Sequence, residues 1–323
     1  MPDHLLPDPK TEKHTDEYKT VTNLNKGYYA ATSGMQGKRK TMEDAHQIKL
    51  EALNDTHFMM VCDGHGGDFC ALQTAELMLP HILEKDNIPT KRSKDEKKIK
   101  ARRSAIADTL KSSFMEVDKK LLALEPIANN DDFSGTTVCA AIITEDEVIC
   151  ANCGDTRCVL SADKKAKDLS SDHKPTKKSE MERIIKAGGR VINGRVNAMH
   201  GVARSLGDFS YKDDGEAEPD NQIVTCKPEL MCYERGDADD DFVLICCDGV
   251  WDVMKSQEAV TFIHNALDKN EVKTLGQALE LLLDMCLAKG SNDNMTAAII
   301  AFPDFAMKHN YFRNKKSAMC SVS

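Results

Sequence analysis

Aspartates next to glycine or asparagine recur where an apolar run of the chain ends or begins. In FMMVCDGHGG, Asp63 directly follows such a run, and in DDFVLICCDGVWD, Asp248 does the same. In SNDNMTAAII, Asp293 stands just before an apolar run, and ANCGDTR places Asp155 in a tight turn between two of them. A charge at the end of a buried segment is costly unless something binds it.

Gathered carboxylates repel one another unless a counter-ion lies between them. An all-oxygen set without a cluster of histidines and cysteines suits a hard cation such as Mg²⁺ or Mn²⁺. One Asp-Gly after a strand is usually only a turn, but four such carboxylates in one chain favour a metal centre. RKTMEDAH adds Glu43 and Asp44, which lie on opposite faces of an extended segment, so at most one can point at a shared centre. We expect Asp44 to be the structural one.

The hydrophobic pattern predicts the elements that carry these residues. Strands are expected near residues 27–33, 44–52, 57–62, 136–143, 147–152, 157–161, 223–233, 242–247 and 295–302. Helices are expected after Gly67, from Ile99 to Leu124 and near residues 182–186, 256–267 and 275–288, with the Lys and Arg of residues 91–103 on a solvated helix face. Strands in runs with helices between the runs indicate an α+β fold with antiparallel sheet. We expect a polar tail over residues 1–24, one domain over 25–304 and a short tail over 305–323.

Charge and composition exclude several classes of protein. A formal net charge of −9 argues against nucleic acid as a partner. The N-terminal segment has no apolar core of a signal peptide, no run approaches the roughly 18 apolar residues of a membrane span, and Pro2 replaces the Gly of a myristoylation signal. Most of the twelve cysteines lie in strand-like runs as reduced thiols, and the Cys150–Cys153 pair has no second pair to complete a zinc site. We expect a soluble monomer of the cytoplasm or nucleus, without a membrane anchor.

Eight motifs in a fixed order resemble the metal-dependent protein phosphatases of the phosphatase 2C type. They are RKTMEDAH, VCDGHGGDF, SGTTVCAAI, ANCGDTRCVL, SDHKP, ARSLGD, CCDGVWDVM and SNDNMT, spread over residues 27–302. Each motif alone is weak, but the ordered set is specific. The resemblance implies a four-layer αββα sandwich, in which two antiparallel sheets pack face to face with helices outside. It also implies a serine/threonine phosphatase that acts on phosphoproteins in signalling.

The resemblance assigns most of the carboxylates to two metal ions, Mg²⁺ or Mn²⁺. Asp63 resembles the aspartate that bridges both ions, and the Gly64 carbonyl would bind one of them. Asp248 and Asp293 resemble ligands of one ion, and Glu43 resembles the carboxylate that holds the other, largely through water. This would explain why an apolar strand leads into a charge.

The remaining site residues follow from the same resemblance. Arg39 resembles the arginine that grips the substrate phosphate with its planar fork, and His65 resembles the proposed general acid. Asp155 and Asp252 match positions of a weaker third metal, with Asp155 in a turn more open to solvent. The implied reaction is direct attack on phosphorus by a hydroxide that bridges the two metals. The absence of a Cys-x5-Arg motif agrees with a route that has no covalent phosphoenzyme.

Two other functions are compatible with parts of this sequence. A pseudophosphatase would keep the sandwich as a scaffold, but the ligand set is present. A hydrolase of small phosphate esters would be separated by comparing a phosphopeptide with a small phosphomonoester. Without the resemblance, His65 would be interpreted as a turn histidine. Residues 174–200, between SDHKP and ARSLGD, correspond to the variable flap of the family, where we expect specificity to arise.

Overall fold

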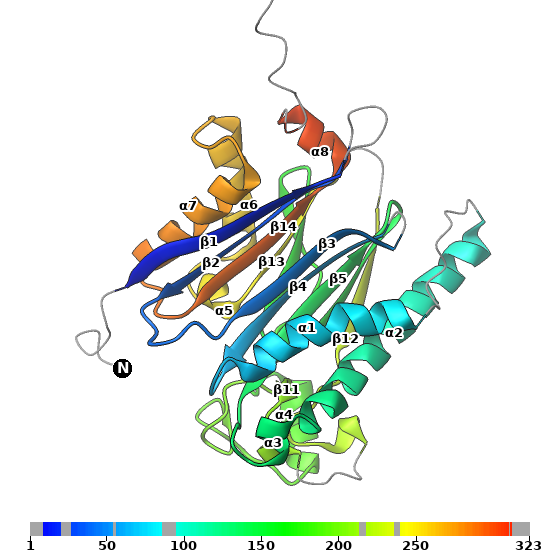
Figure 1. Cartoon of the computed structure of the whole chain (residues 1–323), viewed down its shortest axis with the longest axis vertical. Helices are drawn as coiled ribbons and strands as arrows, with labels where there is room; N and C mark the ends of the chain where they lie inside the picture. Colours follow the sequence, from blue (N-terminus) through cyan, green and yellow to red (C-terminus); the bar gives the residue numbers. More distant parts are fainter. Residues whose placement is uncertain are drawn as a thin grey trace, which may run out of the picture.

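Two antiparallel sheets packed face to face form the centre of the molecule (Figure 1). The computed structural model describes residues 9–20, 27–53, 56–85, 95–212, 218–235, 240–309 and 311. The first sheet has the order β1 (Lys10–Lys19), β2 (Tyr29–Gly37), β14 (Met295–Ala301), β13 (Asp240–Cys246), β7 (Arg157–Ala162) and β8 (Lys165–Asp168). The second has the order β12 (Glu229–Glu234), β6 (Glu147–Cys153), β5 (Gly135–Ile143), β4 (Thr56–His65) and β3 (Ala45–Leu53), and β11 (Leu206–Gly207) also pairs with β5.

Helices cover the outer face of each sheet (Figure 1). On the first sheet these are α5 (Asp248–Trp251), α6 (Ser256–Asp268), α7 (Leu275–Ala288) and α8 (Pro303–Lys308), and on the second α1 (Phe69–Glu84), α2 (Glu96–Leu122) and α3 (Glu125–Ala128). The flap region holds α4 (Lys178–Lys186) and a hairpin of β9 (Val191–Ile192) and β10 (Arg195–Val196); the 3-10 turns η2 (Phe209–Tyr211) and η3 (Pro219–Asn221) follow. The predicted α+β fold and sandwich are confirmed.

Strand β14 shows why the central strands read as unbroken apolar runs. Ala297 and Ile299 pack with the helices outside, whereas Ala298 and Ile300 pack between the two sheets. Successive side chains of a strand point to opposite faces, and here both faces are buried. A strand buried on both sides has no polar face to alternate with, so its hydrophobic run is continuous.

Helix α2 combines a predicted apolar face with ion pairs that were not predicted. Ile106, Leu110, Phe114, Val117 and Leu121 are buried at helical spacing. The expectation that every nearby cation faces solvent is wrong for two arginines. Arg102 is buried and donates to Asp146 at 3.0 Å, and Arg103 binds Glu147 and Glu234. Residues 91–94 of this charged segment lie outside the described residues.

Three boundaries differ from the sequence-based expectation. Lys10–Lys19, expected in a polar tail, form β1 and pair with β2. Residues 223–228 are not strand, and only β12 (Glu229–Glu234) fulfils that prediction. The tail expected after residue 304 begins inside α8. Within the described part of the chain, no helix is long and apolar enough to cross a membrane.

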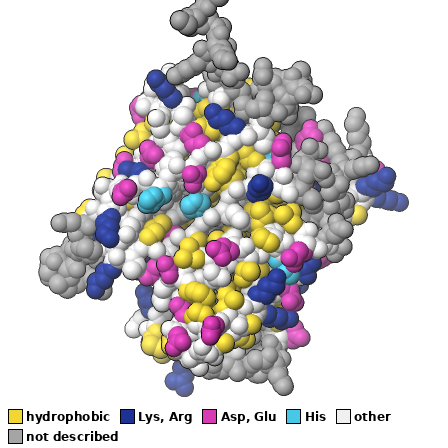
Figure 2. Space-filling model, in the orientation of Figure 1, with side chains coloured by type: hydrophobic (Ala, Val, Ile, Leu, Met, Phe, Trp, Pro, Cys, Tyr) yellow, Lys and Arg dark blue, Asp and Glu magenta, His cyan; other side chains and the backbone are white. Residues whose placement is uncertain are grey.

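Charged side chains are mixed on the face seen in Figure 2. Basic and acidic groups are interspersed there, with hydrophobic side chains exposed between them. This face therefore lacks the continuous basic surface that a nucleic-acid backbone selects.

Candidate active site

Both sheets contribute to one cluster of carboxylates. Asp63 lies in β4 and pairs with Thr137 of β5. Asp248 is the first residue of α5, two positions after β13 ends. Asp155 lies in the turn between β6 and β7. One carboxylate oxygen of each aspartate lies within 4.8 Å of the others. The predicted convergence of these three is therefore seen, although β4 continues through Asp63 to His65 instead of ending before the charge.

The carboxylates of this cluster destabilise one another's charged forms. Burial raises the pKa of Asp63 well above its usual range, and the charges of Asp248, Asp44, Asp155 and Asp293 raise it further. Burial and the neighbouring Asp155 and Asp293 likewise raise the pKa of Asp248 to about 8. A carboxylate with so high a pKa lacks sufficient positive charge around it.

Lys174 supplies a positive charge that sequence reasoning missed. Its Nζ lies 2.5 Å from Asp155 Oδ2 and 3.8 Å from Asp248 Oδ2. Burial favours the neutral amine, but the charge and hydrogen bond of Asp155 outweigh it and raise the pKa of Lys174. The expectation that Asp155 is open to solvent is wrong, because its side chain is only 3% exposed. The ammonium shows that this corner of the cluster accommodates a cation.

Glu43 and Asp44 point in different directions, as their adjacency requires. Glu43 accepts hydrogen bonds from the hydroxyl of Thr41 at 2.6 Å and the backbone N–H of Gly67 at 3.3 Å. Asp44 accepts a hydrogen bond from the hydroxyl of Thr296 at 2.7 Å. One of its carboxylate oxygens also lies within 4.8 Å of an Asp63 oxygen and of the Cys247 sulfur. Asp44 thus makes the structural contact that was expected of it, to a residue of β14, and it also lies beside the carboxylate cluster. Its other oxygen is buried and has no hydrogen-bond partner among the described residues, and burial raises its pKa to about 7.

Gly64 is required by close packing of two backbones. A Cβ atom at this position would lie 2.1 Å from the backbone oxygen of Glu43. Any larger residue would push β4 away from the segment that carries Glu43. The glycine therefore keeps the Glu43 and Asp63 segments side by side.

Arg39 and Asp293 lie together at the rim of the cluster. Arg39 Nη2 donates to Asp293 Oδ2 at 2.5 Å, and the arginine side chain is 56% exposed. The other oxygen of Asp293 accepts from the N–H of Asn294 at 2.8 Å. Asp252 directly follows α5, one turn after Asp248, and its N–H donates to the Asp248 carbonyl at 2.8 Å. Burial raises the pKa of Asp252 against the opposing charge of Lys174. The structure thus brings every predicted site residue to one region.

His65 is held by a carboxylate that sequence reasoning did not assign. Its Nε2 lies 2.8 Å from Oδ2 of Asp208, which belongs to the ARSLGD motif. Burial opposes ionisation of Asp208, but the charge and hydrogen bond of His65 hold its pKa at about 2. Burial lowers the pKa of His65, and the charge of Asp208 more than reverses this, so the net pKa is raised. The sequence signal that could have identified Asp208 is the Gly-Asp at the end of ARSLGD. It is the reverse of the Asp-Gly pairs that contain Asp63 and Asp248.

The donor set fits a hard divalent cation. The groups that converge are carboxylate oxygens, their pKa values show unneutralised charge, and one oxygen of Asp44 is a buried acceptor without a partner among the described residues. Oxygen ligands of this kind suit Mg²⁺ and Mn²⁺. Asp63 and Asp248 offer oxygens to such an ion, with Asp155 close beside them.

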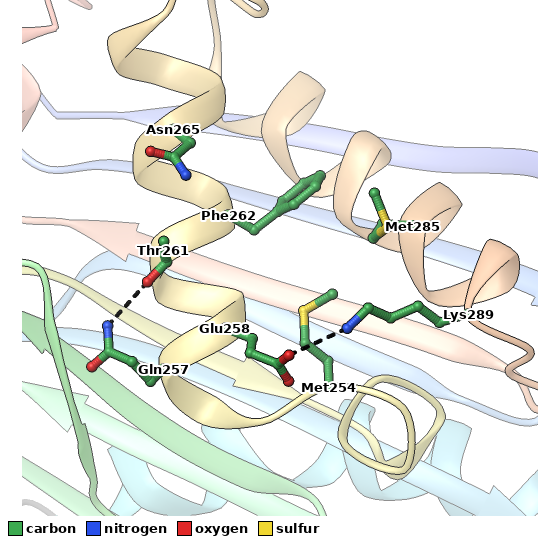
Figure 3. Close-up of a pocket in the computed structure, with 8 residues that line it drawn as sticks. All are labelled: Met254, Gln257, Glu258, Thr261, Phe262, Asn265, Met285 and Lys289. Carbon is green, nitrogen blue, oxygen red and sulfur yellow. Dashed lines mark hydrogen bonds and ion pairs between the residues drawn. The ribbon is translucent and has the colours of Figure 1, made fainter.

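A separate hollow lies between α6 and α7 (Figure 3). It measures about 400 Å³, and Phe262 of α6 and Met285 of α7 face each other across it. Its charges, Glu258 and Lys289, form an ion pair of 3.5 Å. None of the predicted site residues lines this hollow, so it is not the candidate active site.

Comparison with known proteins agrees with this fold. The family model for protein phosphatase 2C matches residues 29–295. Human protein phosphatase 1A is 34% identical over 303 residues, covering 93% of this chain and 76% of that protein. Protein phosphatase 2C homolog 3 of Schizosaccharomyces pombe is 37% identical over 307 residues, covering 92% of this chain and 68% of that protein. The crystal structure of serine-threonine phosphatase 2C from Toxoplasma gondii superposes with a TM-score of 0.73 at 20% identity, over 90% of this chain and 99% of that one.

These matches define a metal-dependent protein serine/threonine phosphatase that acts on phosphoproteins. The chain belongs to the protein phosphatase 2C family. Its dependence on Mg²⁺ or Mn²⁺ agrees with the oxygen donors of the carboxylate cluster.

Without metal, the carboxylate cluster should make stability depend on pH. In the unfolded chain an aspartate ionises near pH 3.9, whereas folded Asp248 keeps its proton up to about pH 8. The metal-free protein should therefore lose stability as pH rises from about 4 to about 8. In EDTA at pH 8, Asp248→Asn should raise stability by on the order of 1 kcal/mol, or about 2–4 °C in Tm. Thermal unfolding at pH 5.5 and pH 8 measures this.

The matched control for this prediction is Asp163→Asn. Asp163 is exposed, and its one ion pair among the described residues is with exposed Lys165, so its substitution should leave the pH dependence unchanged. A metal-free Asp248→Asn protein with the same pH dependence as the parent would contradict the raised pKa.

Proposed function

We propose that two divalent cations, Mg²⁺ or Mn²⁺, bind at the carboxylate cluster of Asp63. In this proposal Asp63 would contribute to both ions. The Gly64 carbonyl, Asp248, Asp293 and Glu43 would provide further ligands. Asp155 and Asp252 would serve a weaker third ion. The observation that carries the proposal is the convergence of Asp63, Asp155 and Asp248 within 4.8 Å, with pKa values raised for Asp63 and Asp248.

When bound, such ions lower the pKa of coordinated water and draw charge from phosphate oxygens. Arg39 would orient the substrate phosphate. Its guanidinium is exposed and lies at the rim, where Asp293 fixes one side of the fork and leaves the other side for a phosphate oxygen. Arg39 therefore positions phosphorus above the cluster.

His65 would give its proton to the departing serine or threonine oxygen. Because Asp208 occupies Nε2 at 2.8 Å, Nδ1 is the nitrogen left for the leaving group. The buried negative charge of Asp208 favours the protonated ring that an acid needs. Asp208 is thus a positioning residue that acts through His65.

The thiols near the cluster support direct hydrolysis rather than a covalent route. Cys62 and Cys247 are fully buried, and burial with the nearby carboxylates raises both thiol pKa values. A thiol kept protonated is a poor nucleophile. These cysteines are therefore unsuited to attack phosphorus, and the cations held by the carboxylate cluster would supply the nucleophile by activating water.

Several finer features stay predictions from the sequence. We propose residues 25–304 as the catalytic domain, which the family match over residues 29–295 supports. Strand β1 (Lys10–Lys19) precedes this range in the chain and pairs with β2 of the first sheet. We further propose that the flap of residues 174–200 selects substrates. A monomeric state, the lack of a nucleic-acid partner and a location in the cytoplasm or nucleus are predictions of the same kind.

Hydrolysis of a phosphothreonine peptide in the presence of a chelator tests the proposal. We expect activity to vanish with EDTA and return with Mn²⁺ at both neutral and mildly alkaline pH, because the cations supply the nucleophile. A small alkyl phosphomonoester assayed in parallel should be cleaved far more slowly than the peptide. Full activity after exhaustive chelation would overturn the metal route, and a preference for the small ester would favour a small-molecule hydrolase.

A further inference from the structure

Three side chains of the type that bind transition metals meet at the His65 corner of the site. One ligand atom each of His65, His200 and Asp208 lies within 4.8 Å of the others. They come from the end of β4, the segment after β10 and the residue after β11. The chain thus folds three distant segments around one point.

His200 has a buried ring nitrogen without a hydrogen-bond partner among the described residues. Its side chain is only 9% exposed, and the nitrogen without a partner is Nε2. That nitrogen lies 3.5 Å from Asp208 Oδ2, and the His200 ring packs edge-on against the His65 ring with centroids 5.0 Å apart. A buried nitrogen aimed at a carboxylate oxygen without a hydrogen bond is a costly arrangement, which a metal ion would relieve.

The spacing suits a tetrahedral ion. Zinc binds histidine nitrogen and carboxylate oxygen at about 2.0–2.2 Å, which places neighbouring ligand atoms about 3.3–3.5 Å apart. Asp208 Oδ2 lies 2.8 Å from His65 Nε2 and 3.5 Å from His200 Nε2. Small side-chain rotations would complete the geometry, and water would take the fourth position. His65 is 34% exposed, so an ion can enter from solvent on that side.

The donor types separate this corner from the carboxylate cluster. Two imidazoles and one carboxylate suit Zn²⁺, whereas oxygen ligands alone suit Mg²⁺ and Mn²⁺. We propose that His65, His200 and Asp208 form an inhibitory Zn²⁺ site separate from the catalytic cations. The inhibition rests on the proposed role of His65. Zinc on Nε2 displaces the proton of that nitrogen to solvent, and the rotation that brings Nε2 to the ion turns Nδ1, the nitrogen that serves the leaving group, away from it.

Zinc titration of the Mn²⁺-saturated protein tests this site. Calorimetry should detect one additional Zn²⁺ per chain, and phosphothreonine-peptide hydrolysis should fall as that site fills. His200→Gln should abolish this binding and raise the half-inhibitory Zn²⁺ concentration at least tenfold, with rates normalised to each variant's own Mn²⁺ activity. The matched control is Met199→Ala, because Met199 is the neighbouring residue and is 71% exposed. Met199→Ala should bind Zn²⁺ like the parent and show the same half-inhibitory Zn²⁺ concentration, with its rates also normalised to its own Mn²⁺ activity because Met199 lies in the flap.

A tenfold increase in Mn²⁺ separates this site from the carboxylate cluster. Inhibition through the histidines should be insensitive to Mn²⁺. Inhibition that Mn²⁺ relieves equally in the parent and in His200→Gln would place zinc at the catalytic cluster and overturn the proposal. Calorimetry also tests the zinc site independently of the proposed function. A parent without phosphatase activity would refute the proposed function, whereas zinc binding by the parent that is lost in His200→Gln would still establish the zinc site.

Discussion

Asp248→Asn should lower the turnover of a phosphothreonine peptide by about three orders of magnitude. The substitution keeps the shape of the side chain but removes one charge from the cluster of Asp63, Asp155 and Asp248. Metal ions supply several kcal/mol of transition-state stabilisation, and a loss of about 4 kcal/mol corresponds to about 10³ in rate. Steady-state rates measured over a range of Mn²⁺ concentrations test this, because weakened binding appears first as a higher Mn²⁺ requirement.

Asp155→Asn should lower turnover less than Asp248→Asn does. Asp155 is buried and paired with Lys174 at 2.5 Å, so its loss frees an ammonium that already lies 3.8 Å from Asp248. We expect a smaller fall in turnover than for Asp248→Asn, because the freed ammonium weakens cation binding without removing a principal ligand. The exposed Asp163→Asn is the control, with parental rates. An Asp248→Asn enzyme that binds Mn²⁺ and turns over like the parent would show that the centre of the site lies elsewhere.

Asp208→Asn should reduce turnover more for a substrate whose leaving group needs a proton than for one whose leaving group does not. General acid catalysis contributes about 10²–10⁴ to the rate, and Asp208 acts by holding His65 at 2.8 Å. The kcat for a phosphothreonine peptide, whose alkoxide needs a proton, should fall by about 10²-fold or more. An aryl phosphate with an acidic phenol leaves without a proton and should lose much less. KM for the peptide should change little.

His65→Gln provides the matched comparison for Asp208→Asn. Both variants should show the same dependence on the leaving group, and the double variant should lose little more than either one, because the two residues act as a unit. Equal losses on the peptide and the aryl phosphate would indicate a structural role for Asp208 and refute the positioning role.

The fold was predictable where strands are buried on both faces. Ala297 to Ile300 alternate between the helices and the inter-sheet layer, so the sequence carries a continuous apolar signal. β1 has no such signal: KTEKHTDEYK is polar throughout, and only its hydrogen bonds to β2 make it a strand. Edge strands of this kind are set by pairing with a partner rather than by their own hydrophobicity.

The sequence predicts the candidate site residues where one short motif contains both the carboxylate and the apolar run that places it. Asp63, Asp248 and Asp155 each follow or join apolar runs that end at the same edge of the sandwich. Lys174 and Asp208 were missed because their roles depend on tertiary contacts. Lys174 meets Asp155 from 19 residues away, and Asp208 meets His65 from 143 residues away. No local pattern encodes such distances along the chain.

Asp63 is the residue that we propose to hold both principal cations. Calorimetric titration of Mn²⁺ into the metal-free parent and into Asp63→Asn tests this role directly. The parent should bind two ions tightly and a third more weakly. Asp63 lies close to Asp44 in one group of possible metal ligands and close to Asp155 and Asp248 in another. Because it belongs to both groups, its substitution should abolish both tight sites together. If Asp63→Asn retains two tight Mn²⁺ sites, the carboxylate cluster does not hold the catalytic metals.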